Sequence, residues 1–150
     1  MDIAAGNPTA GDAIRADALR LSAAALEAAI AADPTIRERY DETGLRRLLH
    51  DGELLVDRLA TCVSSGEIRW LTEYAEWIQP IYRRRRVPLG DLGALCAGIR
   101  EKVAPQLGPN ELEVATRSLD AAIAILGRNS RLGGDGHKRN ALWQWLYKGV

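Results

Sequence analysis

Apolar residues recur three or four positions apart along most of this 150-residue chain, which is the spacing that places them on one face of a helix. No stretch of useful length alternates apolar and polar residues, as a half-buried strand would. The pattern therefore predicts an all-α domain of about six helices. We expect either a globin-like or an orthogonal bundle.

The first half of the chain is expected to form three helices. Alanines are frequent between residues 9 and 32, and they permit the close approach of another helix to this first one. Asp33 and Pro34 are typical of the residues that begin a helix, and they predict a short one through residue 40. A longer helix follows from Leu45 until Gly66, where glycine favours a left-handed C-terminal cap.

The segment 67–86 is expected to form a helix with two adjoining apolar faces. The first face holds Ile68, Leu71, Ala75, Ile78 and Tyr82, and the second holds Trp70, Tyr74, Trp77 and Ile81. Together they cover about half of the circumference, which exceeds the stripe of about 100° that a helix packed on one side shows. Pro80 lacks a backbone N–H and should bend the helix near its end.

Two further helices are predicted, the first from Pro88 to near Pro105 and the second over about 110–127. The chain then divides into a flexible arm (1–8), a helical sensor-like domain (9–127), and a glycine-rich joint with a short aromatic C-terminal helix (128–150). The aromatic residues of that last helix, Trp143, Trp145 and Tyr147, are expected to pack back on the domain.

Composition gives no sign of a polyanionic partner, because 20 Lys and Arg residues balance 20 Asp and Glu residues. Cys62 and Cys96 lie among apolar helical positions and lack the neighbours of a zinc site, so both are expected to be free thiols. The sequence shows neither a signal-peptide pattern nor an apolar run long enough to cross a membrane. We therefore expect a cytoplasmic protein with no membrane partner.

The residue types that enzymes use for catalysis do not form a recognisable motif. His50 and His137 are the only histidines, and neither belongs to the His-Glu-x-x-His pattern that holds zinc on a helix. The glycines of the segment 132–136 do not follow a strand, as those of a phosphate-binding loop would, and we interpret them as a joint. The expectation is a protein that is not an enzyme and that holds no metal or cofactor.

The stripe formed by Trp70, Tyr74, Trp77 and Ile81 has three interpretations. These side chains could complete the core of their own domain, could bury against a second copy or a partner protein, or could line a ligand pocket between helices. The spacing of the residues is the same in all three cases.

A ligand pocket would involve His50, because a helical histidine that faces a cavity can bind the metal of haem or of another tetrapyrrole. Its neighbours Arg46, Arg47 and Asp51 favour the polar side of the helix instead. A binding protein or sensor for an apolar or tetrapyrrole ligand, with His50 as axial ligand, therefore remains the alternative function.

Four consecutive arginines, Arg83, Arg84, Arg85 and Arg86, end the aromatic helix and could bind an anion such as phosphate. Four successive helical positions nevertheless point around the whole circumference, and cations at a helix C-terminus interact favourably with its dipole. We therefore expect a solvated helix end that pairs with acidic groups such as Asp91, and nucleic acid is not favoured as a partner.

Residues 35–126 resemble a known family in the order of their helices and in one motif. The motif is the arginine-rich end of an aromatic helix, Tyr82 to Arg86, followed by Val87-Pro88-Leu89 and further leucines. It resembles the N-terminal sensory domain of stressosome co-antagonist proteins of the RsbR type. The resemblance implies a globin-like domain without haem that dimerises and passes a signal to an attached regulatory domain. That phosphorylatable domain is not among these 150 residues, which favours a separate protein partner.

These observations predict a non-enzymatic sensory or regulatory module, of use in a stress response, that forms a homodimer and binds a regulatory protein. The homodimer is expected because the other helices are too few to cover both apolar faces of the segment 67–86. Its interface should use Trp70 or Trp77, or else the remaining faces of the helices that contain Leu89 and Leu112.

Overall fold

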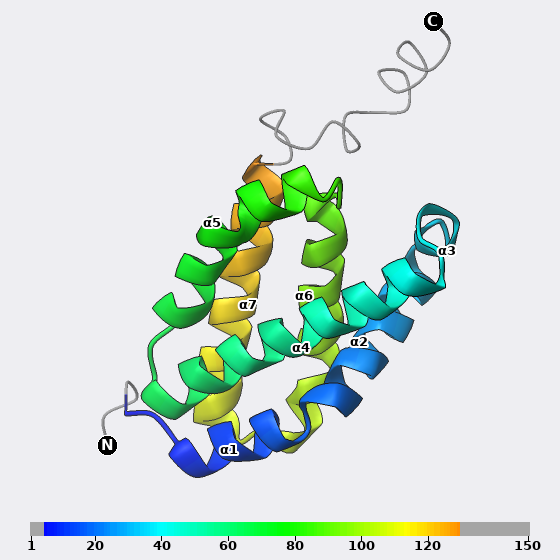
Figure 1. The fold of residues 1–150 in the computed structure, drawn as a ribbon. Coiled ribbons are helices and arrows are strands. Elements are labelled where there is room, and N and C mark those ends of the chain that lie inside the picture. Colours follow the sequence, from blue (N-terminus) through cyan, green and yellow to red (C-terminus); the bar gives the residue numbers. More distant parts are fainter. Residues whose placement is uncertain (1–4, 130–150) are drawn as a thin grey trace, which may run out of the picture.

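The computed structural model describes residues 5–129, and all the regular structure in this range is helical (Figure 1). The predicted all-α fold is therefore confirmed. The predicted C-terminal helix, with Trp143, Trp145 and Tyr147, lies outside the described residues. The helices in chain order are α1 (Pro8–Ala16), α2 (Ala18–Ala32), α3 (Ile36–Arg39), α4 (Glu42–Ser65), α5 (Arg69–Arg84), α6 (Leu89–Val103), the 3₁₀ helix η1 (Ala104–Gln106) and α7 (Pro109–Asn129).

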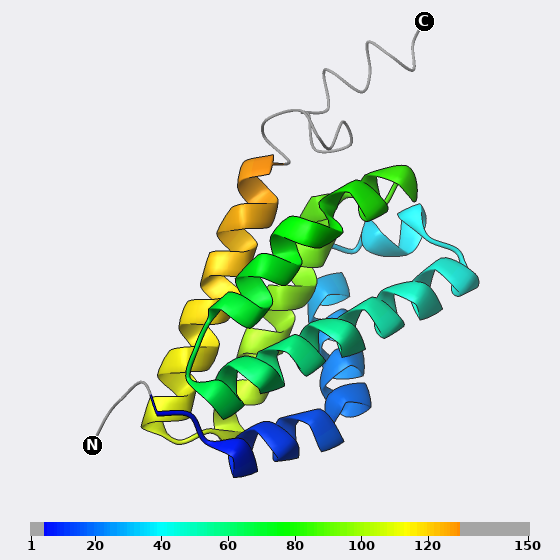
Figure 2. The ribbon, with the colours of Figure 1, turned by 60° about the vertical axis from the view of Figure 1, so that its left-hand side comes forward.

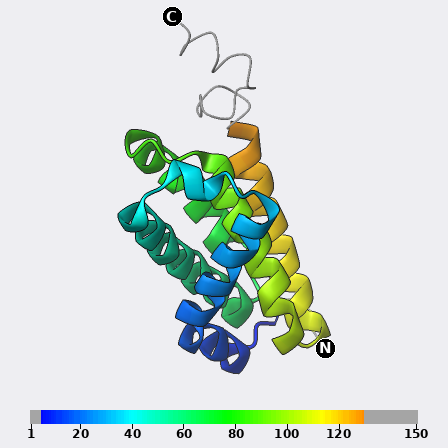
Figure 3. The same ribbon diagram turned by 90° about the vertical axis from the view of Figure 1, so that its right-hand side faces the viewer.

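Helix α4 is the central element of the bundle, and it contacts α1, α2, α5, α6 and α7. Helices α5 and α7 run side by side on one side of it (Figure 1), whereas α2 and α6 pack together on the other (Figure 3). The hydrophobic core lies between these two pairs, where residues such as Leu55, Leu59 and Leu95 have at most 1% of their surface exposed.

The crossing of α2 and α6 depends on small residues, as the alanine-rich sequence predicts. A Cβ atom added to Gly98 would lie 2.5 Å from the carbonyl oxygen of Ala25, so only glycine permits this approach. Helix α2 is also fixed to α4, because the buried Ser22 Oγ donates a hydrogen bond of 2.6 Å to the carbonyl oxygen of Leu49.

The single helix predicted from residue 9 to residue 32 is divided in the structure. Asp17 leaves the helical conformation, with φ −104° and ψ 15°, and separates α1 from α2. The carboxylate of Asp17 pairs with Arg20 in the first turn of α2. The break lets α1 lie on α4 while α2 continues between α4 and α6, two directions that one straight helix could not follow.

The chain enters the bundle earlier than the predicted arm of residues 1–8 allows. Pro8 is the first residue of α1, and the Asn7 side chain caps the helix by accepting a hydrogen bond from the Ala10 N–H. Asn7 also donates its backbone N–H to the Val63 carbonyl and its Nδ2 to Glu111 Oε1. Residues 5–8 are therefore held against α4 and α7, and residues 1–4 lie outside the described range.

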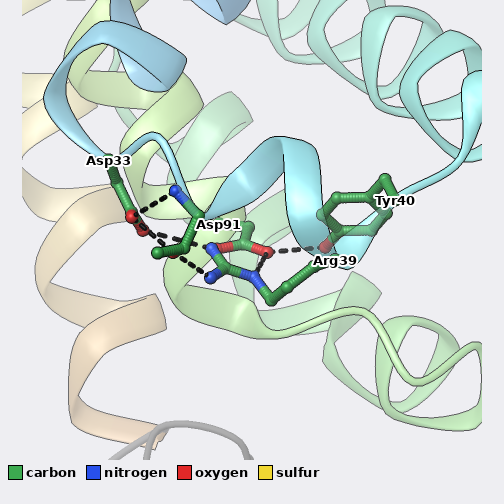
Figure 4. Close-up of polar contacts among 5 residues, drawn as sticks. Asp33, Arg39, Tyr40 and Asp91 are labelled. Carbon is green, nitrogen blue, oxygen red and sulfur yellow. Dashed lines mark hydrogen bonds and ion pairs between the residues drawn. The ribbon is translucent and has the colours of Figure 1, made fainter.

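A buried ion pair attaches the α2–α4 corner to the beginning of α6 (Figure 4). Arg39 Nη2 lies 2.7 Å from Asp91 Oδ1, and the side chain of Asp91 is only 3% exposed. The hydroxyl of Tyr40 donates to the other oxygen of Asp91, and Arg39 also contacts Asp33. Asp33 was predicted to begin the short helix, but it ends α2 and accepts hydrogen bonds from Thr35 instead.

Removal of the Arg39 guanidinium should destabilise the fold strongly, because it leaves the Asp91 carboxylate buried without a cation. We expect Arg39→Ala to lower the free energy of unfolding by about 3 kcal/mol. Arg37, in the same short helix, is exposed, so Arg37→Ala should change stability by no more than about 0.5 kcal/mol. Urea unfolding monitored by circular dichroism measures the free energy of unfolding of both variants. Equal effects of Arg39→Ala and Arg37→Ala would contradict a structural role for the Arg39–Asp91 ion pair.

Candidate interaction surface

Helix α5 presents the two apolar faces that its sequence predicts, and the two faces differ in how far they are buried. Leu71, Ala75, Ile78 and Tyr82 are buried against the core. On the adjoining face Trp70, Tyr74 and Ile81 are half-buried, whereas 66% of the Trp77 surface is exposed. The domain's own core therefore covers one face fully and the second only in part.

Trp77 belongs to a cluster of side chains from both α4 and α5. The rings of Tyr74 and Trp77 lie 6.2 Å apart between centroids, with an angle of 36° between their planes. The Arg58 guanidinium of α4 lies 4.9 Å from the centre of the Tyr74 ring. Leu54, which is 39% exposed, precedes Arg58 by one helical turn on α4. We call these four residues, Leu54, Arg58, Tyr74 and Trp77, the aromatic face.

Trp70 takes a different position from Trp77, although both belong to the predicted stripe. Its ring packs against the hydrophobic core and is covered by the Arg69 guanidinium at 4.3 Å. Its indole N–H is buried and has no hydrogen-bond partner among the described residues. Trp70 is therefore an edge residue of the core, and Trp77 is the member of the stripe that is presented to solvent.

Helices α4 and α5 diverge from their connecting turn, as Figure 2 shows, and a buried carboxylate joins them again near the end of α5. Gly66 forms the turn with φ 79° and ends α4 as predicted. At the other end, Arg85 lies 3.3 and 3.4 Å from the two carboxylate oxygens of Asp51, whose side chain is 5% exposed. Burial, together with the nearby Asp51, raises the pKa of Tyr82, which stays a neutral hydrogen-bonding phenol.

This pairing corrects the prediction for the arginine-rich helix end. Asp91 was expected to pair with it, but the partner of Asp91 is Arg39, and Arg85 pairs with Asp51 of α4 instead. Asp91, in the first turn of α6, faces Arg39 and Tyr40 at the α3 corner, whereas Arg85, just after α5, reaches Asp51 of α4. Arg83 contacts Gln79 of its own helix, so Arg83 and Arg85 have different partners.

An open hollow of about 590 Å³ lies where Arg85 meets α4. Its lining consists of Thr43, Arg46, Arg47, His50, Asp51 and Arg85. The His50 side chain is 68% exposed, and its Nδ1 lies 3.8 Å from Glu53 Oε2. Trp70, Tyr74 and Trp77 do not line this hollow, so the structure does not bring His50 and the three aromatic residues together around it.

The last arginine of the run, Arg86, has a left-handed backbone with φ 59°. Its N–H donates to the Arg83 carbonyl and that of Val87 donates to the Tyr82 carbonyl, which together form a Schellman cap at the end of α5. Glycine is the usual residue at this position, because a side chain adds a steric cost of about 1–2 kcal/mol in the left-handed region.

Replacement of Arg86 by glycine should therefore stabilise the protein. We expect Arg86→Gly to raise the free energy of unfolding by about 0.5–1 kcal/mol, since the strain is larger than the backbone entropy that glycine adds. Arg84 has an ordinary helical backbone in the last turn of α5, so Arg84→Gly should lower stability by about as much. In thermal unfolding, the unfolding temperature should rise for Arg86→Gly and fall for Arg84→Gly. A fall for both variants would show that Arg86 does not have the left-handed backbone of a cap.

The described residues offer little to catalysis by a metal or a thiol. No group of three or more His, Cys, Asp or Glu side chains within 5–129 is placed to hold a metal ion. Burial raises the pKa of Cys62 to about 11 and that of Cys96 to about 12, so both thiols stay protonated near neutral pH. Within the same residues, no helix combines the length and the apolar character needed to cross a membrane.

Both thiols should be inert in the folded protein. At about pH 8 we expect DTNB to react with neither Cys62 nor Cys96 until the chain is unfolded by guanidinium, because only an exposed thiolate attacks the reagent. The absorbance of the released thionitrobenzoate counts the reactive groups. Fast reaction of a thiol in the folded state would show that burial at that position is incomplete.

The comparisons with known proteins add no relative. No protein-family model matches the chain, and no curated protein matches it. The case for a function therefore comes from the geometry of the α4–α5 surface and from the resemblance noted in the sequence.

Three residues that shape this surface were not predicted: Leu54 and Arg58 were not singled out, and Asp51 was assigned to the polar side of its helix, whereas the structure buries it against Arg85. Asp51 carries a usable signal, because it follows Leu48 by three positions and precedes Leu55 by four, and both leucines are buried. A carboxylate at such a core-facing position requires a partner. Leu54 and Arg58 carry no comparable signal, since their role depends on which part of α5 lies opposite them.

Proposed function

We propose that this chain is a non-enzymatic sensory or regulatory module that acts by forming a homodimer and by binding a partner protein. The observation that carries the proposal is the aromatic face, in which a largely exposed Trp77 stands beside Tyr74, Arg58 and Leu54 on two helices. A globin-like arrangement of the helices is part of the proposal.

The composition of the aromatic face is that of an interface centre. Single exposed apolar residues are common on protein surfaces and need no explanation. Here, however, an exposed tryptophan lies beside a tyrosine with its ring tilted against it, and an arginine of the neighbouring helix lies over that tyrosine. Trp, Tyr and Arg are the residues that most often contribute binding energy at the centre of protein interfaces. A tryptophan ring that already contacts the half-buried Tyr74 loses less side-chain entropy on binding than a fully solvated ring would.

A two-fold dimer would give the side chains of the aromatic face complementary neighbours in the second copy. In such a dimer the same face of each copy meets the other, so Arg58 of one copy can approach the Trp77 ring of a second copy. Glu73, which is exposed one turn before Trp77, can supply a carboxylate for the same arginine. The resemblance to RsbR-type sensory domains supports the proposal independently, because those domains dimerise.

The absence of catalytic function is proposed on chemical grounds. The buried thiols are protonated, and His50 is exposed with only a distant carboxylate neighbour. The alternative, a tetrapyrrole site built from His50 and the aromatic residues, has less support because these residues do not line one hollow.

Introduction of a charge at Trp77 should separate the dimer without unfolding the protomer. We expect wild-type protein to sediment as a dimer at micromolar concentration and Trp77→Glu to sediment as a monomer, because the substitution removes the aromatic ring from the centre of the interface and adds a charge that must be desolvated there. Trp77 is mostly exposed, so the unfolding temperature of the isolated protomer should change by only a few degrees.

Leu19 supplies the matched control, since it is 59% exposed and lies on α2, outside the aromatic face. Leu19→Glu should remain dimeric. A wild-type monomer at micromolar concentration would contradict the proposed dimer. If Leu19→Glu dissociates the dimer and Trp77→Glu does not, the interface lies on another face.

A further inference from the structure

Three of the six residues that line the hollow at the end of α5 are arginines, although the whole chain carries no net charge. Its volume of about 590 Å³ falls within the range of about 300–1,000 Å³ of pockets that hold small ligands. The lining includes Arg46, Arg47 and Arg85, with His50 and Thr43 beside them. Thr43 lies in the first turn of the long helix α4, where the helix dipole adds positive potential.

Asp51 is the acidic residue of this lining, and its carboxylate already forms an ion pair with Arg85. Its side chain is 5% exposed, and both carboxylate oxygens face Arg85 at 3.3 and 3.4 Å. Because these contacts are long and involve two of the five guanidinium N–H donors, Arg85 keeps donors for a ligand. Asp51 thus holds Arg85 in position at the wall of the hollow.

The remaining cations are only weakly neutralised. Arg46 contacts Glu42, but both side chains are at least 75% exposed, and such solvent-exposed pairs contribute little. Arg47 is paired with no acidic group among residues 5–129, although it lines the hollow. Arg84 and Arg86 in the adjoining end of α5 add to the local positive potential.

We propose that this hollow is a binding site for a small molecule that carries phosphate groups. A phosphate group offers several acceptor oxygens, and the rigid forks of arginine match them with paired hydrogen bonds. Arg46 and Arg47 of α4 and Arg85 at the end of α5 line one open hollow rather than following a groove, which favours a small ligand over a nucleic acid. The site lies apart from the aromatic face and does not depend on the proposed dimer.

Calorimetric titration with pyrophosphate and with ATP tests the site, using the full chain at low ionic strength. We expect saturable binding with a dissociation constant below about 1 mM, and Arg47→Ala should weaken it about 10-fold or more. Arg117→Ala is the matched control, because Arg117 is exposed on α7, and it should change affinity less than about 2-fold. Arg85→Lys, which keeps a cation beside Asp51 but loses the fork, should also weaken binding while the far-ultraviolet spectrum stays unchanged.

Three results would overturn the proposal. The first is no saturation by either ligand up to about 10 mM, and the second is an equal loss of affinity in Arg117→Ala and Arg47→Ala. The third is tighter binding of a single-stranded oligonucleotide than of pyrophosphate at equal phosphate concentration. Trp77→Glu should bind pyrophosphate as the wild type does, so failure of the dimer and failure of this site are distinguishable.

Discussion

The arrangement of α4 and α5 depends on the ion pair between the buried carboxylate of Asp51 and Arg85. Gly66 joins the two helices at one end, and this pair joins them again beyond the point where they diverge. The aromatic face occupies the surface between these two connections, and the cationic hollow lies at the second one. Asp51, in the core-facing register of α4, therefore joins the two helices that carry both surfaces.

Most of the helices follow from local information in the sequence. The apolar spacing and the signals at Gly66 and Pro88 are properties of a few neighbouring residues, and they predict α4, α5 and α6 closely. The division at Asp17 is different, because it is required by the separate surfaces on which α1 and α2 pack. No local signal in the sequence predicts this division, since the alanines on both sides of Asp17 favour a continuous helix.

The candidate site likewise depends partly on local spacing and partly on the packing of helices that are distant in the sequence. The spacing of Trp70 and Trp77 places both on one stripe, but only the packing of the other helices decides that Trp70 joins the core edge and Trp77 remains exposed. Ion pairs between residues that are far apart in the sequence also cannot be predicted from local spacing. Arg39 pairs with Asp91, and Arg85 with Asp51, whereas proximity in the sequence favours Arg85 with Asp91.

We propose that Trp77 lies at the contact between two copies of this domain. An isotope-filtered nuclear Overhauser experiment on a mixture of labelled and unlabelled protein observes only contacts between copies. We expect cross-peaks between the Trp77 ring and protons of α4 or α5 in the second copy. Intermolecular cross-peaks that arise from other helices, with none to Trp77, would contradict it.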